Sequence, residues 1–223
     1  NADAVMLAWI AADEPLQLLQ LPTELGIKTP DSTKPVPLGS LWQRGGTALM
    51  ADSLREIIGL PNGVPQRYVV VPRRVVRGFI DGLGDLEIAL PEAYTSEDRS
   101  QGFVVNLQAG RQRLDGDETE QLLRYIETPL DQSNRRSRQR LVIQALVEQL
   151  KTPSGFQRIK RVLTGLQTDL DSNLTQFELL SLTAAVMASP AGMQISQLDL
   201  EPRANGQPLR QLKQNQTLPL WPN

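Results

Sequence analysis

The sequence predicts a single α/β domain in which helices cover both faces of a mixed central β-sheet. Short apolar runs at residues 68–71 and 86–90 flank a helical pattern that ends at Gly82 and Gly84. This strand–helix–strand order is typical of a crossover unit in a sheet with helices on its faces. The second half of the chain is mostly helical in its apolar spacing. With 223 residues the chain is long enough to bury a substantial core.

The strands follow from short apolar runs bounded by turn residues. The polar segment at residues 13–15 separates two apolar runs, and this pattern predicts a hairpin near the N-terminus. We expect one mixed sheet to hold five strands, at residues 4–12, 15–22, 66–71, 86–90 and 103–107.

The helices follow from apolar residues that recur every three or four positions. Gly45 and Gly46 precede one such pattern, which ends at Gly59. Four further helices are expected at residues 117–127, 135–150, 155–166 and 176–188. We expect residues 116–127 and 135–150 to pack against the sheet, within a domain formed by residues 1–190. A strand near 195–200 and the tail to residue 223 should complete the same domain.

Composition excludes several kinds of active site. The chain has no His and no Cys, so it has no catalytic triad with His, no Cys nucleophile and no Cys/His zinc site. The formal net charge is −2, whereas a dedicated DNA-binding domain is normally basic. No stretch is apolar for long enough to span a bilayer. The chain begins at Asn1, directly before a core strand, and we expect further residues upstream of it.

The most unusual segment is the Asn-Arg-Arg-Ser-Arg-Gln-Arg of residues 134–140. Four arginines lie in the first two turns of a predicted helix, where the helix dipole favours negative charge. Arg135, Arg138 and Gln139 share one face with Val142, so this face should meet the core. Backbone N–H groups together with Arg side chains form a strong anion-binding combination. The segment therefore predicts a phosphate site.

A simpler interpretation of the same segment is a solvated basic turn. In that case the arginines pair with acids such as Glu127 and Asp131. Spacing alone does not choose between the two interpretations. The helix would be capped by Asp131, Ser133 or Asn134.

A second candidate site lies at the ends of the predicted hairpin. Asp3 precedes the first strand and Glu24 follows the second, so the hairpin brings them near one another. Two carboxylates of this kind can share a hard cation such as Mg²⁺. Acids at strand ends are more often simply solvated, and this alternative stays open.

Taken in order, these segments resemble the LytR-CpsA-Psr (LCP) family of bacterial cell-envelope proteins. The family's Ser-Asp-Thr before an apolar strand is similar to residues 1–7, and its Ile-Pro-Arg-Asp is similar to residues 21–24. Further along the chain, the family's Gly-Gly helix is similar to residues 45–60, and its strand–helix–strand is similar to residues 68–91. The family's Gly-x-Gln-x-Leu-Asp-Gly is similar to residues 110–116, and its Gly-Arg-x-x-Arg-Gln is similar to residues 134–139. It covers residues 2 to about 190.

The resemblance implies a fold, an activity and a location. LCP proteins are membrane-anchored phosphotransferases that face outward from the plasma membrane. They move a glycan phosphate from a polyprenyl pyrophosphate lipid onto peptidoglycan or another envelope acceptor. The lipid tail occupies an apolar channel between sheet and helices. This chain is therefore expected at the extracytoplasmic face, anchored by an N-terminal helix upstream of Asn1, with a role in cell wall biogenesis.

The resemblance also assigns roles to individual residues. Asp3 is similar to a metal-linked Asp of the family, which implies a Mg²⁺ cofactor. Arg135 and Gln139 match a pyrophosphate-binding Arg and Gln. With Arg138, they are expected to face one crevice near the mouth of the channel, with Asp3 within reach. Arg135 and Arg138 are the expected catalytic residues, and both of them together with Gln139 should bind substrate.

The sequence departs from the family where the family has charged residues. Thr23 stands in place of an Arg and Glu24 in place of an Asp, while Glu127 and Pro129 stand in place of two arginines. Pro37 takes the position of another basic residue. A further family Asp belongs to a strand that precedes Asn1.

Three functions are therefore open. The first is an active phosphotransferase with a divergent site. The second is a catalytically impaired LCP-fold domain that binds a polyprenyl-phosphate-linked or anionic envelope glycan. The third, a transcriptional regulator, is disfavoured by the acidic charge balance and by the lack of a helix-turn-helix pattern.

Overall fold

The computed structural model forms two compact units, which are described separately. The first consists of Asn1–Tyr68 and Pro190–Asn223, and the second of Val69–Ser189. The described residues are 1–10, 15–59, 65–98, 103–128, 131–188, 193–203, 209–214 and 216. The predicted hairpin turn at residues 13–14, Pro129 and the end of the tail lie outside them. The prediction that residues 1–223 form one domain stays a prediction.

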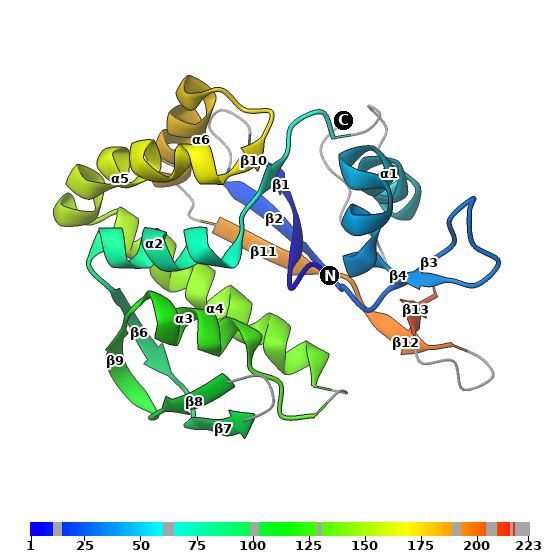
Figure 1. Ribbon diagram of the computed structural model, residues 1–223, viewed down its shortest axis with the longest axis horizontal. Coiled ribbons are helices and arrows are strands. Elements are labelled where there is room, and N and C mark those ends of the chain that lie inside the picture. Colours follow the sequence, from blue (N-terminus) through cyan, green and yellow to red (C-terminus); the bar gives the residue numbers. More distant parts are fainter. Residues whose placement is uncertain are drawn as a thin grey trace. The chain divides into compact units, whose positions relative to one another are not determined.

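The first unit is built on a mixed three-stranded sheet (Figure 1). Strand β1 (Val5–Trp9) pairs antiparallel with β2 (Leu16–Leu21), in a register that sets Val5 opposite Leu21. Strand β11 (Met193–Gln197) pairs parallel with the other edge of β2. The predicted N-terminal strand pair is confirmed, and the predicted C-terminal strand lies beside it.

One helix supplies much of the remaining core of the first unit. A 3₁₀ turn, η1 (Leu38–Ser40), leads into α1 (Leu41–Ile58), which ends where Gly59 adopts a left-handed conformation with φ 66°. The predicted start at Gly45 is wrong by four residues. Gly45 and Gly46 instead form a kink inside the helix, because their backbone angles are not helical.

The core of the first unit joins the sheet, the 3₁₀ turn and the helix. Its fully buried members include Leu19 and Leu21 of β2, Leu38 of η1 and Ile58 of α1. Two small antiparallel pairs complete the unit; they are β3 (Gly26–Ile27) with β4 (Val36–Pro37), and β12 (Leu200–Pro202) with β13 (Arg210–Leu212).

The strands of the second unit correct the prediction of one shared sheet. They form three separate antiparallel pairs, namely β5 (Val69–Val70) with β10 (Asp171–Ser172), β6 (Leu86–Leu90) with β9 (Gly110–Leu114), and β7 (Tyr94–Asp98) with β8 (Phe103–Leu107). Among the described residues, none of these strands pairs with β1 or β2. The expected parallel crossover between residues 68 and 90 is also wrong. The β6–β9 and β7–β8 pairs join strands that are close in sequence, and such pairing closes short loops at a lower cost in chain entropy than a crossover.

The described part of the second unit also contains five α-helices. They are α2 (Arg73–Leu83), α3 (Gly116–Arg124), α4 (Gln132–Leu150), α5 (Pro153–Leu166) and α6 (Gln176–Ala188). Strand β6 alternates buried and exposed residues, and its buried Leu86, Ile88 and Leu90 share a core with Val142 of α4. Helices α3 and α4 therefore pack against strands, as predicted, although against β8 and β6 rather than one central sheet.

The Gly-x-Gln-x-Leu-Asp-Gly segment at residues 110–116 has a structural explanation. Gly110 begins β9 with φ 99°, a value that favours glycine. Asp115 accepts a hydrogen bond from Glu118 N at 2.8 Å, and the Glu118 carboxylate accepts one from Asp115 N at 3.1 Å. This capping box starts α3. An added Cβ at Gly116 would lie 2.5 Å from the carbonyl oxygen of Arg77, so only glycine allows α2 and α3 to approach this closely.

Within the described part of the chain, no helix combines the length and apolar character needed to cross a membrane.

Candidate functional site

The predicted site residues are divided between the two units. Asp3 belongs to the first unit, whereas Arg135, Arg138 and Gln139 belong to the second. Each group is described within its own unit. The expectation that Asp3 lies within reach of the arginines stays a prediction.

In the first unit, the backbone of Gly39 joins the two segments that carry the acids. Ala2 N donates a hydrogen bond to Gly39 O at 2.7 Å, and Gly39 N donates one to Thr23 O at 3.0 Å. Asp3 directly follows Ala2, and Glu24 directly follows Thr23, so each acid is next to a residue that is hydrogen-bonded to Gly39. The prediction that the hairpin ends lie near one another is therefore confirmed.

The prediction that Asp3 and Glu24 share a Mg²⁺ ion stays a prediction. Mg²⁺ is usually held by one or two carboxylates, with substrate phosphate oxygens and water completing its ligands. In the described residues, no cluster of three or more acidic, His or Cys side chains is arranged to hold a metal alone.

Replacing Gly39 tests the junction. An added Cβ would lie 3.0 Å from Ala2 O and 3.1 Å from the Thr23 Cβ, closer than most real contacts. We expect Gly39→Ala to lower the free energy of unfolding by about 1–3 kcal/mol, the usual cost of overpacking. Urea denaturation measures this. Gly165→Ala is the control, because nothing lies within 4 Å of its added Cβ; equal stability of the two variants would contradict the close approach.

In the second unit, α4 begins three residues before the predicted start. Asp131 occupies the N-cap position, but its side chain makes no capping hydrogen bond. Its backbone carbonyl accepts the first helical bond from Arg135 N at 3.1 Å. Its carboxylate instead accepts a bond from Arg138 Nη2 at 3.3 Å. Asp131 is thus one of the three predicted candidates for the cap, and it is used as an ion-pair partner.

The predicted face of α4 meets the core. Arg138, Gln139 and Val142 are 4%, 3% and 5% exposed, and Arg135 is half-buried. The simpler interpretation of a solvated basic turn is wrong for this face. Its suggestion that Asp131 pairs with an arginine is confirmed for Arg138.

Arg138 is surrounded by a small set of side chains, here called the Arg138 cage: Tyr94, Tyr125 and Asp131. Its guanidinium carbon lies 5.3 Å from the ring centroid of Tyr94 and 4.9 Å from that of Tyr125. The two rings lie 5.4 Å apart in an edge-to-face arrangement. Nη2 also donates to the carbonyl oxygen of Tyr125. Cation–π contacts of this kind are strongest when the cation is desolvated, as it is here.

The burial of Tyr94 has a consequence for its ionisation. Burial raises the pKa of the Tyr94 phenol above its ordinary value of 10.0, the Glu92 carboxylate raises it further, and the Arg138 cation lowers it. The neutral phenol is therefore the form that the folded state favours.

We expect this group to make stability depend on alkaline pH. A pKa raised by folding contributes stability that is fully present below the pKa of the unfolded chain, about 10, and is lost as pH rises through the folded value. Urea unfolding between about pH 8 and 11 should show this loss. Tyr94→Phe should show a smaller decline than the parent; an equal decline would contradict the assignment.

Other arginines of the chain also have acidic partners. Glu120 is buried and accepts hydrogen bonds from Arg77 at 2.8 Å and from Arg124 at 3.2 Å. Arg44 lies 4.0 Å from Asp31, with both side chains largely exposed.

Sequence patterns did not reveal several of these residues. Gly39, Tyr94 and Glu120 belong to no periodic pattern, and only their tertiary contacts identify them. Tyr125 lies inside the predicted helix 117–127, whereas the structure ends α3 at Arg124 and places Tyr125 directly after it. The departures from the family are partly described: Thr23 is half-buried, Glu127 is exposed and Pro37 ends β4, while Pro129 lies outside the described residues.

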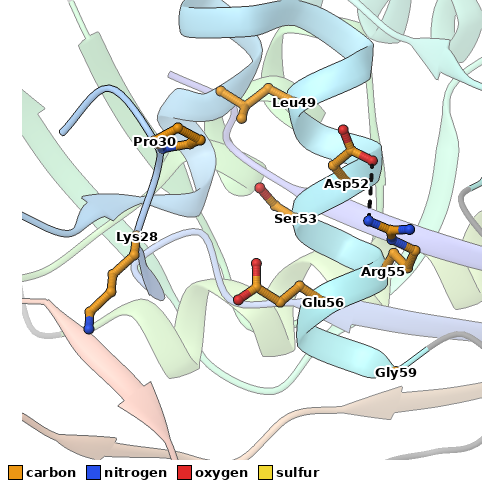
Figure 2. A pocket seen from close by; sticks show the side chains of 8 residues that line it. All are labelled: Lys28, Pro30, Leu49, Asp52, Ser53, Arg55, Glu56 and Gly59. Carbon is orange, nitrogen blue, oxygen red and sulfur yellow. Dashed lines mark ion pairs between the residues drawn. The ribbon is translucent and has the colours of Figure 1, made fainter.

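An open pocket of about 600 Å³ lies in the first unit, between α1 and the segment after β3. Figure 2 shows its lining, with Lys28 and Pro30 on that segment and the others on or just after α1, namely Leu49, Asp52, Ser53, Arg55, Glu56 and Gly59. Asp52 and Arg55 form an ion pair at 3.9 Å. This pocket is rich in charge and does not match the predicted apolar channel, which stays a prediction.

The sequence model described as the LytR_cpsA_psr family matches residues 1–221. The chain belongs to the LytR-CpsA-Psr family of cell-envelope proteins, as its motifs indicated.

Solved structures agree with this family assignment. TagV from B. subtilis has a TM-score of 0.75 at 14% identity, with 94% of this chain and 82% of TagV covered. The LytR-Csp2A-Psr enzyme from Actinomyces oris has a TM-score of 0.74 at 19% identity, with 95% and 81% covered. A structure described as TagT bound to LI-WTA has a TM-score of 0.70 at 17% identity, with 94% and 77% covered. No curated protein sequence matches the chain. These likenesses confirm the predicted LCP-like α/β fold.

Proposed function

We propose that this chain is an extracytoplasmic LCP-type phosphotransferase domain. It transfers a glycan phosphate from a polyprenyl pyrophosphate carrier onto peptidoglycan or another envelope acceptor. The observation that carries the proposal is the start of α4, where Arg135 and Gln139 lie on the face that leads into the apolar core. An amphipathic lipid pyrophosphate needs such a junction of cationic and apolar surface. The similar TagT structure with LI-WTA supports a cell-wall glycopolymer as the donor.

The residues of α4 would act on the pyrophosphate. The Arg135 guanidinium and the Gln139 amide donate hydrogen bonds to phosphate oxygens, and the first N–H groups of the helix add to the positive field. The acceptor hydroxyl forms a new bond to the glycan-linked phosphorus and releases its proton to water, while the bond from that phosphorus to the bridging oxygen breaks. Polyprenyl phosphate is the leaving group, and its negative charge is stabilised by the same donors.

Asp3 and Glu24 would hold a Mg²⁺ ion at the acidic end of the hairpin. The ion would neutralise charge on the pyrophosphate during transfer. The Gly39 junction keeps the backbone of both acids in place.

The alternative function is a catalytically impaired domain that binds a polyprenyl-phosphate-linked or anionic envelope glycan. The pairing of Arg124 with Glu120 and of Arg138 with Asp131 favours it, because these cations are neutralised by internal carboxylates. With Thr23 in place of an arginine, few cations are left to stabilise transition-state charge. Binding through Arg135 would then persist without rapid turnover.

Removing Arg135 tests the binding site that both functions share. We expect Arg135→Ala to weaken binding of farnesyl pyrophosphate by about 1.5–3 kcal/mol, the scale of one hydrogen bond to a charged group. Isothermal titration calorimetry with Mg²⁺ present measures the change. Arg140→Ala is the matched control, because Arg140 lies on the same helix and donates to the Ser137 hydroxyl at 3.0 Å.

Two negative results of this titration would contradict different parts of the proposal. Equal affinity of Arg135→Ala and the parent would show that Arg135 is not a ligand. Failure of the parent itself to bind would remove the lipid pyrophosphate from the proposal.

A further inference from the structure

Arg138 connects both ends of the segment between α3 and α4. Tyr125 is the C-cap residue of α3, and Asp131 is the N-cap residue of α4. Arg138 donates hydrogen bonds to both of them, and it also contacts the ring of Tyr94, the first residue of β7. One buried cation thus links three elements of the second unit.

The atoms of Arg138 are turned inward. Its side chain is 4% exposed, and its Nη2 atom serves two acceptors of the protein itself. Among the described residues, its Nε atom is buried without a hydrogen-bond partner, while its guanidinium contacts the two rings and Nη2 makes both hydrogen bonds. A phosphate ligand needs donors that are free to bond the phosphate, and the Nη2 donor of Arg138 is committed to the carbonyl oxygen of Tyr125 and the carboxylate of Asp131.

We propose that Arg138 is a positioning residue rather than a phosphate ligand: the Arg138 cage fixes the first turns of α4, and thereby the directions of Arg135 and Gln139. The inference rests on the proposed function, because it concerns how that binding face is held. Arg135 precedes Arg138 by three residues and Gln139 follows it directly, so both share its stretch of backbone. A guanidinium fork that is bonded at two points restricts this stretch more than a lone apolar contact would.

A role of Arg138 as a phosphate ligand and a role as a positioning residue predict opposite effects of Asp131→Asn on the affinity for farnesyl pyrophosphate. If Arg138 were a phosphate ligand, the Asp131 carboxylate would compete with the phosphate, and its removal would strengthen binding. If Arg138 positions the helix, loss of the carboxylate loosens the cage and weakens binding. We expect farnesyl pyrophosphate to bind about tenfold more weakly to Asp131→Asn, the scale of one charge-assisted bond.

The experiment combines this titration with hydrogen exchange on the ligand-free protein. Asp131→Asn and Arg138→Lys should accelerate amide exchange at residues 131–139 by about tenfold or more, the range expected when a local contact is lost. Exchange near Leu150, at the other end of α4, should change little. Val147→Ala is the matched control, because it removes buried volume from the far half of α4 and leaves the cage intact. It should leave exchange at residues 131–139 and farnesyl pyrophosphate binding unchanged.

Each outcome decides one question. Faster exchange confined to the start of α4, together with weaker binding, supports the positioning role. Tighter binding by Asp131→Asn, or unchanged exchange at residues 131–139, overturns it. If the parent does not bind farnesyl pyrophosphate, the proposed function fails, and the exchange measurement still decides whether the cage holds the helix start.

Discussion

Replacing Arg138 with Ala is expected to lower the free energy of unfolding by about 3–5 kcal/mol, the cost of breaking a buried ion pair. Asp131 is 9% exposed, and without Arg138 its carboxylate remains buried without a cation. The change also removes the contacts with the rings of Tyr94 and Tyr125. Urea denaturation measures the loss, which is large for a single substitution.

Two further variants test whether loss of the buried ion pair causes the fall in stability of Arg138→Ala. Arg140→Ala removes an arginine from the same helix and should stay within about 0.5 kcal/mol of the parent, as surface substitutions do. The double change Arg138→Met with Asp131→Leu removes both charges and should recover much of the stability, since apolar replacements of buried ion pairs are often neutral. A loss below about 1 kcal/mol for Arg138→Ala, the scale of an exposed pair, would show that the cage contributes little.

The second expected result concerns turnover. Glycan transfer by this chain should be slow or absent, and Thr23→Arg should raise it by about 10- to 150-fold, the equivalent of a hydrogen bond to a charged group. Thr23 is half-buried beside Gly39, in the segment that carries Glu24. An arginine there would stabilise the charge that develops on the transferring phosphoryl oxygens, so its effect falls on the transition state more than on ground-state binding.

A transfer assay with Mg²⁺ and a lipid pyrophosphate donor measures this effect. Thr33→Arg is the matched control, since it adds the same charge at an exposed threonine of the first unit. Transfer by the parent at about 1 per second or faster, an ordinary enzyme rate, would refute the impaired site. Arg44, Arg73 or Arg124 would then have taken over the role, which for Arg124 requires release from Glu120.

Local sequence patterns determined the elements and the family. The apolar runs at residues 4–12 and 15–22 predict a hairpin, and spacing on α4 predicts the buried face of Arg138, Gln139 and Val142. Both predictions are confirmed, because side-chain periodicity is a property of the element itself. The order of short motifs along the chain is enough to indicate the LytR-CpsA-Psr family.

Only the tertiary structure decided how the strands pair and what each arginine contacts. The apolar runs at residues 86–90 and 103–107 predict strands, but an apolar run does not specify which other strand it pairs with. In the structure, β6 pairs with β9 and β8 pairs with β7. Spacing put Arg135 and Arg138 on one face of α4 and made them equal candidates for phosphate binding. The folded chain gives Arg138 contacts with Tyr94, Tyr125 and Asp131, none of which the spacing on α4 predicts. A side chain's environment is assembled by the fold, so spacing along a helix does not determine what each arginine contacts.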